Sequence, residues 1–337
     1  MEHIVEFPGL GIRVTVNEVA LALTESYSIR WYGVIIALGY LLAVLYAWRS
    51  VKKMNISMDR LIDAVIAGTI GGIVFARLYY VVFYYDSTGH NRYFENPIDI
   101  LKIHDGGIAI YGGVLGALLI GGLVARWRGI RVPAVLDIAC LGFLIGQGVG
   151  RWGNFVNQEC FGGPTDLPWG MVSDNTGGVA VHPCFLYESL LCLLGFVLLH
   201  VFTRKYRRYD GQTFILYLIW YGVVRFFIEG TRTDSLVLFQ GGPKVSQLVA
   251  AGCVLAGVIL LVVFRNRNDL SGCGDRHVME SVGLIKSEVD PSLRTSTIFG
   301  DLPPFEETAD SKDEEKSGEQ EKPDGAKKKH KKKKESR

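Results

Sequence analysis

The sequence lacks the residue patterns that usually bind metal ions or form redox pairs. Its six cysteines never occur as a CxxC pair or at a Cys/His spacing typical of a metal site. Four of them fall inside apolar runs, where cysteine behaves as a small hydrophobic residue. The apolar runs also lack the paired aspartates that hold Mg²⁺ in many enzymes acting on phosphorylated lipids. The sequence therefore predicts neither a metal ion nor a cofactor.

The first 30 residues lack a basic segment followed by an apolar core, so we expect no cleavable signal peptide. Apolar residues, in contrast, are abundant and make up 49% of the 337 residues. A helix needs about 20 apolar residues to cross a bilayer. Runs of about that length occur near 31–48, 60–83, 107–125, 133–151, 184–203, 212–230 and 245–264. The sequence thus predicts an all-α integral membrane protein with seven transmembrane helices.

Basic residues fall in every second connection between these runs. They are Arg49, Lys52 and Lys53, then Arg126, Arg128 and Arg131, then Arg204, Lys205, Arg207 and Arg208, and finally Arg265 and Arg267. Short loops rich in lysine and arginine stay in the cytoplasm. We therefore expect the N-terminus outside the cell and the C-terminus in the cytoplasm.

The remaining segments suggest how the chain is divided. The outer connections 84–106 and 152–183 are long and rich in Gly, Asn, Asp and aromatic residues, so we expect them to form an outer arm and head that carry function. Residues 1–267 would form one transmembrane domain. Residues 268–337 are highly charged and would form a disordered cytoplasmic tail. The lysine block from Lys327 to Lys334 is a candidate for contact with anionic lipid, and we expect no nucleic-acid partner.

Arginines at costly positions indicate a site for phosphate. Helical rise places Arg77, Arg151 and Arg225 about 26, 27 and 20 Å from the cytoplasmic starts of their spans, in the outer half of the membrane. A charge buried there is costly and usually functional, and guanidinium groups bind phosphate through paired hydrogen bonds. Glu229 follows Arg225 by four residues, so it can hold Arg225 on one helical face.

Three other interpretations explain these arginines less well. A transporter would carry charged groups through the full depth of the bundle, whereas the inner half here has few. A membrane scaffold would leave the outer arginines without a purpose. A structural ion pair between helices would explain Arg225 and Glu229 alone, but not three arginines in the same half of the membrane.

The stretch Gly150-Arg151-Trp152-Gly153-Asn154-Phe155-Val156-Asn157-Gln158-Glu159-Cys160-Phe161-Gly162 resembles the signature of the prolipoprotein diacylglyceryl transferase family, approximately G-R-x-G-N-F-x-N-x-E-x-x-G. Other landmarks of that family follow in the expected order. They are Arg30-Trp31-Tyr32-Gly33, Gly106-Gly107, Tyr111-Gly112-Gly113, His182-Pro183, Tyr187-Glu188 and Arg225-Phe226-Phe227-Ile228-Glu229. The resemblance covers roughly residues 28 to 264 and leaves the tail outside it.

The resemblance implies a specific reaction. Family members transfer the sn-1,2-diacylglyceryl group of phosphatidylglycerol to the lipobox cysteine of a prolipoprotein signal peptide, forming a thioether and releasing glycerol phosphate. This would be the first step of lipoprotein maturation, at the outer face of the bacterial inner membrane. The partners implied are phosphatidylglycerol and prolipoproteins.

The resemblance also implies the site residues. It places Arg151, Asn154, Glu159 and Gly162 of the signature in the active site. It adds Tyr32, Arg225 and Glu229, and we include Arg77 for its depth. Arg151 and Arg225 would stabilise the charge on the departing phosphate, and Asn154 would donate to lipid oxygens. Glu159 would orient an arginine or take the thiol proton.

One position departs from the family pattern. Many members have a histidine, proposed as the base, where Tyr111 stands in this chain. Tyrosine has an ordinary pKa near 10 and is a poor base at neutral pH. We therefore expect Tyr111 to hydrogen-bond the lipid head group. His104 and His182 are weaker candidates for the base, whose identity stays open.

Overall fold

A computed structural model describes residues 2–22, 28–84, 90–102, 106–233 and 242–285 of the chain. Contacts divide the chain into two units, Met1–Ser287 and Glu288–Arg337, and the second unit lies outside the described residues. The predicted disorder of the distal tail, the lysine block and His104 therefore also lie outside them.

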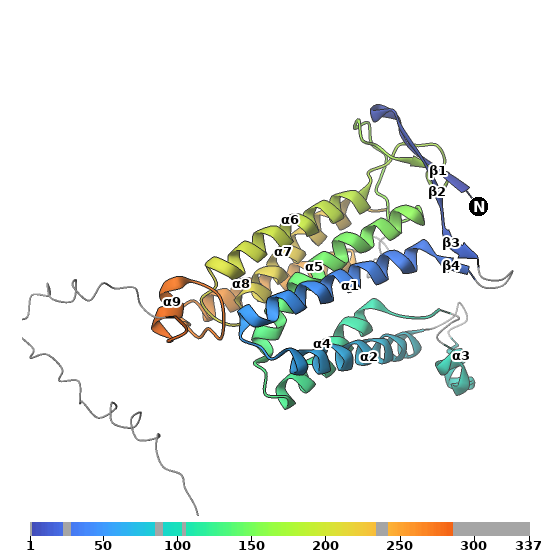
Figure 1. Cartoon of the computed structure of the whole chain (residues 1–337). Helices are drawn as coiled ribbons and strands as arrows, with labels where there is room; N and C mark the ends of the chain where they lie inside the picture. The colour runs from blue at the N-terminus through green and yellow to red at the C-terminus, as the bar shows by residue number, and fades with distance from the viewer. Residues whose placement is uncertain (1, 23–27, 85–89, 103–105, 234–241, 286–337) are drawn as a thin grey trace, which may run out of the picture. The chain divides into compact units, whose positions relative to one another are not determined.

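Seven long apolar helices run back and forth through the described part of the chain, which confirms the predicted number of spans (Figure 1). They are α1 (Trp31–Val51), α2 (Met58–Phe83), α4 (Ile110–Trp127), α5 (Val132–Val156), α6 (Cys184–Lys205), α7 (Gln212–Thr231) and α8 (Val245–Val263). The chain is thus a multi-pass membrane protein. We call the end where α1 begins and α2 ends the outer end, after the orientation predicted above.

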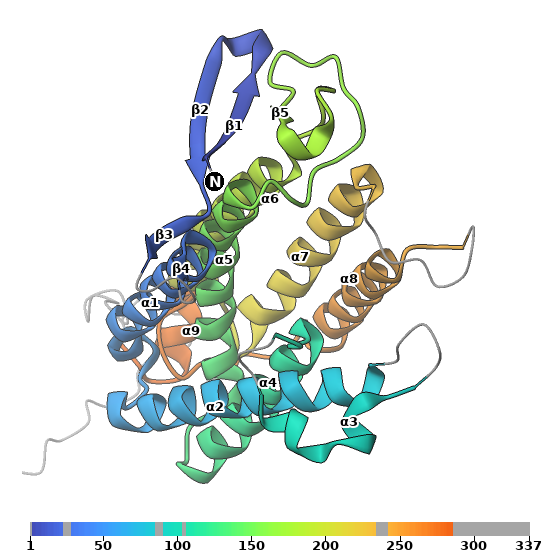
Figure 2. The same ribbon diagram turned by 90° about the vertical axis from the view of Figure 1, so that its right-hand side faces the viewer.

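Small residues allow α2 and α4 to approach each other closely. A Cβ added at Gly68 would lie 3.4 Å from the Cα of Gly121, and one added at Gly72 would lie 3.2 Å from the carbonyl oxygen of Gly113. Such glycines are favoured between membrane helices, where close packing of backbones drives association. The pair stands side by side in Figure 2, which shows the outer end.

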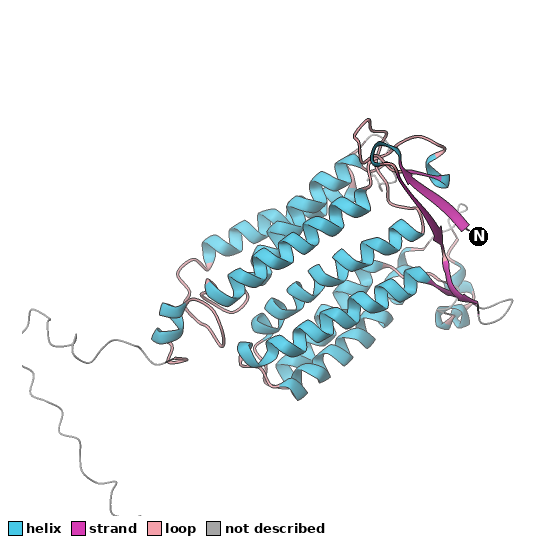
Figure 3. Cartoon of the chain, turned by 45° about the horizontal axis from the view of Figure 1, so that its top comes forward, coloured by secondary structure: helices cyan, strands magenta, loops and turns pink. Residues whose placement is uncertain are grey.

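Short strands, not predicted from the sequence, cover part of the outer end (Figure 3). The strands β1 (Glu2–Phe7), β2 (Ile12–Asn17) and β5 (Val172–Ser173) form an antiparallel sheet in the order β2-β1-β5. A second pair joins β3 (Val19–Ala22) to β4 (Ser28–Arg30), which leads into α1. Because Val5 pairs with Ser173, the N-terminal hairpin is bonded to the long connection between α5 and α6.

Short helices complete the connections. They are the α-helices α3 (Arg92–Glu95) and α9 (Arg276–Ser281), and the 3-10 helices η1 (Pro8–Leu10), η2 (Lys52–Met54), η3 (Pro97–Leu101) and η5 (Asp174–Thr176).

The structure corrects the start of the tail. Residues 268–285, expected to be disordered, fold against the inner end of the bundle. The Cys273 amide donates to the carbonyl oxygen of Lys53 at 2.8 Å, and the Asp275 amide donates to that of Arg207 at 2.8 Å. Leu270 is buried. The sequence did not predict these contacts, because the tail as a whole is highly charged and the contacts link positions far apart in the sequence.

Candidate active site

The C-terminal part of α5 carries the first site residues. The helix continues to Val156, five residues beyond the predicted span, so Arg151 and Asn154 are helical and lie on one face. The Arg151 Nη1 donates to Asn154 Oδ1 at 3.2 Å. The helix therefore fixes the arginine and the asparagine relative to each other.

Glu188 on α6 binds both predicted arginines. Its Oε1 accepts a hydrogen bond from Arg151 Nη2, and its Oε2 accepts one from Arg225 Nη1 at 3.4 Å. The Glu188 side chain is only 6% exposed, whereas those of Arg151 and Arg225 are 23% and 15% exposed. One buried carboxylate thus brings together two guanidinium groups from α5 and α7 that stay open to a ligand.

Glu229 holds the second arginine from its own helix, as its spacing predicted. Its Oε2 lies 2.6 Å from Arg225 Nη2, and the Glu229 side chain is almost fully buried. The two carboxylates Glu188 and Glu229 offset the cost of burying Arg151 and Arg225. Among the described residues these contacts are made by the two Nη atoms of each guanidinium group, which carries five N–H groups in all.

Asn154 links this cluster to Glu159. The Asn154 Nδ2 donates to Glu159 Oε1 at 2.8 Å, and Asn157 Nδ2 donates to the same oxygen at 3.4 Å. Asn154 is buried, while Glu159 is exposed. A chain of hydrogen bonds therefore runs from Arg151 through Asn154 to a carboxylate that a substrate can reach.

Gly162 lies where three segments meet. A Cβ at this position would lie 2.8 Å from the Cβ of His182, 2.9 Å from Cys184 Sγ and 3.0 Å from the carbonyl oxygen of Thr231. Its amide donates to the carbonyl oxygen of His182 at 2.9 Å. Gly162 thus permits the close backbone approach that joins the end of α7 to the start of α6. These contacts do not test the prediction that Gly162 binds the lipid, which stays a prediction.

Tyr32 and Tyr111 are each the second residue of a helix that begins at the outer end, α1 and α4. The Tyr32 ring on α1 packs against Gly153, because a Cβ there would lie 2.8 Å from the ring Cδ2. Tyr111, the second residue of α4, is 43% exposed.

Arg77 has a different role from the one predicted. It is 4% exposed and donates five hydrogen bonds, all to backbone carbonyl oxygens. A guanidinium has five N–H groups, so none is left for a phosphate. This saturation contradicts the expectation that Arg77 binds phosphatidylglycerol. In the sequence it could not be distinguished from the other two arginines, because the carbonyls that it binds belong to a separate loop.

Glu188 is the residue that the sequence analysis did not assign to the site. A signal was present, since Glu188 is an acidic residue in an apolar span of 22 residues and is the fifth residue from the outer start of that span. His182 Nδ1 lies 3.3 Å from the hydroxyl of Tyr187, which also accepts a hydrogen bond from Trp169. These contacts give His182 a local structural partner.

Within the described residues, no three His, Cys, Asp or Glu side chains converge to hold a metal ion.

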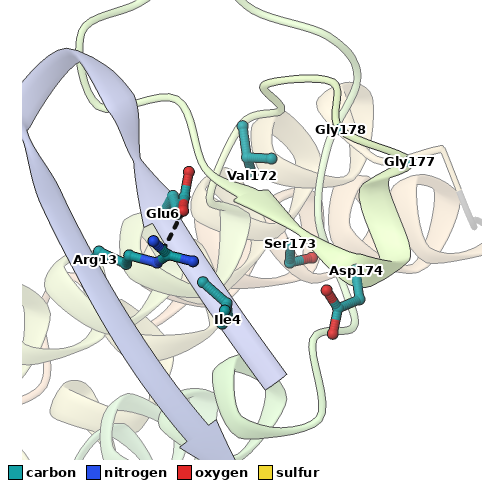
Figure 4. A pocket seen from close by; sticks show the side chains of 8 residues that line it. All are labelled: Ile4, Glu6, Arg13, Val172, Ser173, Asp174, Gly177 and Gly178. Carbon is teal, nitrogen blue, oxygen red and sulfur yellow. Dashed lines mark ion pairs between the residues drawn. The ribbon is translucent and has the colours of Figure 1, made fainter. Parts of the chain in front are cut away.

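A separate hollow lies at the outer sheet and is lined by residues of β1, β2 and β5 and of the turn that follows β5 (Figure 4). Its lining includes Glu6 and Arg13, which form an exposed ion pair at 3.1 Å, and the loop glycines Gly177 and Gly178. None of the predicted site residues lines it. The chemistry of the arginine cluster therefore does not involve this hollow.

Comparison with known proteins supports one family. The model of the family described as prolipoprotein diacylglyceryl transferase matches residues 18–263. The chain is 41% identical over 239 residues to the phosphatidylglycerol–prolipoprotein diacylglyceryl transferase of Finegoldia magna, covering 71% of this chain and 92% of the relative. Proteins of the same name from Staphylococcus xylosus and Clostridioides difficile are 42% and 39% identical, over 71% and 72% of this chain and 86% and 94% of theirs.

Proposed function

Since the chain belongs to the prolipoprotein diacylglyceryl transferase family, we propose that the cluster of Arg151, Arg225 and Glu188 is the site of its transfer reaction. The chain is a transferase of the first step of lipoprotein maturation, with phosphatidylglycerol as the lipid donor. The acceptor is the lipobox cysteine of a prolipoprotein. The site faces the outside of the bacterial inner membrane, which the basic residues at the inner end support.

The reaction forms one bond and breaks another at the glyceryl carbon that carries the phosphate. The cysteine sulfur attacks this carbon, a C–S bond forms, and the C–O bond to the phosphate breaks. The electron pair of that bond leaves with glycerol phosphate. Because negative charge grows on the phosphate oxygen, donors fixed in advance near that oxygen lower the barrier.

Arg151 and Arg225 provide those donors. The observation that carries this assignment is the bridge through Glu188, whose two oxygens fix both guanidinium groups while other N–H groups of each remain for the lipid. Glu229, one turn nearer the outer end of α7, also holds Arg225. In a site shielded from water such contacts are stronger than in solution.

The other site residues act around this pair. Asn154 orients Arg151, and its link to Glu159 supports a role for that carboxylate as the group that takes the thiol proton, directly or through a water molecule. Tyr32 packs against the active-site helix, and the Tyr111 hydroxyl donates to the head group. Gly162 keeps the loop after α5 close to α6 and α7.

The transferase domain, on this proposal, includes the packed residues 268–285 as well as residues 1–267. The lysine block of the tail contacts anionic lipid, which its charge supports.

The reaction can be tested with the purified protein in nanodiscs containing phosphatidylglycerol and a peptide with a lipobox cysteine. We expect the peptide to gain the mass of a diacylglyceryl group and glycerol phosphate to be released in equal amount. A peptide with serine in place of the cysteine is the control. A folded protein that yields neither product would contradict the assignment.

A further inference from the structure

The helix that carries Arg225 and Glu229 directs its negative end towards the proposed phosphate site. α7 runs from the inner end of the bundle to the outer end, and Arg225 precedes its last residue, Thr231, by six positions, or about 9 Å of helix. The peptide dipoles of a helix place about half a negative charge at its C-terminus. This end repels a phosphate, and the repulsion grows as the C–O bond breaks and the phosphate gains a second negative charge.

Lys244, the N-cap residue of α8, binds this end of α7. Its ammonium group donates to the carbonyl oxygens of Glu229 and Arg232, each at 2.6 Å. Glu229 lies in the last turn of α7, and Arg232 is the C-cap residue. The last carbonyl oxygens of a helix lack amide partners within the helical ladder. A lysine satisfies such carbonyls and also offsets the negative end of the dipole.

Neutral groups bind other carbonyl oxygens near the same end. The Gly163 amide donates to the carbonyl oxygen of Thr231 at 3.0 Å. Gln247 Nε2, one turn into α8, donates to that of Phe226 at 3.1 Å. These contacts add hydrogen bonds without charge, whereas Lys244 adds both.

The other end of α7 is held by a charge of the opposite sign. The Gly211 and Phe214 amides donate to the two carboxylate oxygens of Asp137 on α5, each at 2.8 Å, and Asp137 is fully buried. A carboxylate suits the positive N-terminus of a helix as an ammonium group suits its C-terminus. Charged side chains from two other segments therefore hold α7 at both ends, which fixes the depth of Arg225.

Lys244 reaches the arginine cluster through Glu229. The backbone oxygen of Glu229 accepts the hydrogen bond from Lys244, and its side chain pairs with Arg225 at 2.6 Å. A shift of this last turn moves a carboxylate that holds Arg225. Lys244 is also half-buried, so water and salt screen its charge less than that of an exposed lysine.

We propose that Lys244 is a positioning residue of the transfer reaction that acts through the last turn of α7. It holds this turn with two hydrogen bonds, and its charge offsets the negative end of the helix next to the departing phosphate. The inference rests on the proposed function of the arginine cluster.

Two variants of the full-length protein in phosphatidylglycerol nanodiscs separate the charge of Lys244 from its hydrogen bonds. Lys244→Gln keeps a donor but no charge, whereas Lys244→Arg keeps both. Because the extra charge forms only as the C–O bond breaks, we expect kcat of Lys244→Gln to fall about three- to thirtyfold. The KM for phosphatidylglycerol should change less than kcat, and Lys244→Arg should keep most of the wild-type kcat.

The matched control is Lys102→Gln, which removes a lysine from an outer ion pair with Asp99 at 2.7 Å and should leave kcat unchanged. Melting temperatures are measured in the same nanodiscs, and kcat is measured below the lowest of them, so that every variant is folded in the assay.

Three results would overturn the role of Lys244. They are a wild-type kcat in Lys244→Gln, an equal loss of kcat in Lys244→Gln and Lys244→Arg, and a rise in KM with kcat unchanged. A folded wild-type protein that releases no glycerol phosphate would instead overturn the proposed function, and the role of Lys244 with it.

Discussion

At the scale of single residues, three arginines that look alike in the sequence differ in their hydrogen bonds. Arg77 donates all five of its N–H groups to backbone carbonyl oxygens. Arg151 and Arg225 instead donate to side chains, and in the described residues some of their N–H groups have no protein acceptor. The difference comes from what surrounds each guanidinium group. The number of satisfied donors, more than depth in the membrane, distinguishes the structural arginine Arg77 from the two arginines that we propose bind the substrate.

Glu188 is expected to act as a positioning residue. Glu188→Gln keeps the shape of the side chain but weakens its hold on both arginines. A hydrogen bond to a charged group contributes about 1.5–3 kcal/mol, so we expect kcat to fall about ten- to a hundredfold. The KM for phosphatidylglycerol should change little, because both arginines remain.

Steady-state kinetics of the purified variant measure this split between kcat and KM. The control is Glu6→Gln, which removes the charge from an exposed ion pair in the outer sheet. A rise in KM with kcat unchanged would mean that Glu188 holds the lipid and does not position the arginines.

Tyr111 tests the departure from the family pattern. If its hydroxyl only donates to the head group, Tyr111→Phe loses about 0.5–1.5 kcal/mol of binding. We expect the KM for phosphatidylglycerol to rise about two- to tenfold with little change in kcat. Tyr40→Phe, which removes a hydroxyl bonded to Thr69 at 2.9 Å, is the matched control. Loss of kcat in the Tyr111 variant alone would instead make this hydroxyl part of the proton transfer.

At the scale of elements, hydropathy predicted the helices but not what joins them. Each span is a local property, since partition of a run into lipid depends on that run alone. The pairing of Val5 with Ser173 and the contacts of Glu188 link positions more than 30 residues apart, and no local pattern encodes them. The signature on α5 nevertheless identified Arg151, Asn154 and Glu159, which the structure joins by hydrogen bonds.

The close packing of the chain at Gly162 can be tested by comparing alanine substitutions at Gly162 and at the adjacent Gly163. Gly162→Ala would force a Cβ into the space next to His182 and the backbone of Thr231, and overpacking of this kind costs about 1–3 kcal/mol. We expect a lower melting temperature and lower activity. Gly163→Ala meets no atom within 4 Å and should behave like the wild type. Equal melting temperatures for the two variants would show that the junction is not tightly packed.

At the scale of the whole molecule, the folded unit ends later than its charge pattern suggests. The family match ends at residue 263, yet the chain contacts the inner end of the bundle again at Cys273 and Asp275. There Arg207 Nη1 lies 2.9 Å from Asp137 Oδ2, and both side chains are fully buried. The Arg207 Nε also donates to the carbonyl oxygen of Cys273 at 3.2 Å.

Two truncations separate the packed segment from the tail. A chain that ends at Ile285 should keep the melting temperature and activity of the full chain. A chain that ends at Arg267 loses the burial of Leu270, which contributes about 1.5–3 kcal/mol, and uncovers the Asp137–Arg207 pair. We expect its melting temperature in nanodiscs to fall clearly. Identical melting curves for the two truncations would mean that residues 268–285 do not stabilise the bundle.

The central claim is that two arginines fixed by one carboxylate stabilise the departing phosphate. The most direct test is the single-turnover rate of diacylglyceryl transfer by Arg151→Lys and Arg225→Lys, with Arg13→Lys in the exposed sheet as control. Lysine keeps the charge that the buried carboxylates require, so the protein stays folded, but it loses the paired donors. We expect rates about 10²–10³-fold below the wild type for both site variants and an unchanged rate for the control. Transfer near the wild-type rate by either site variant would contradict it.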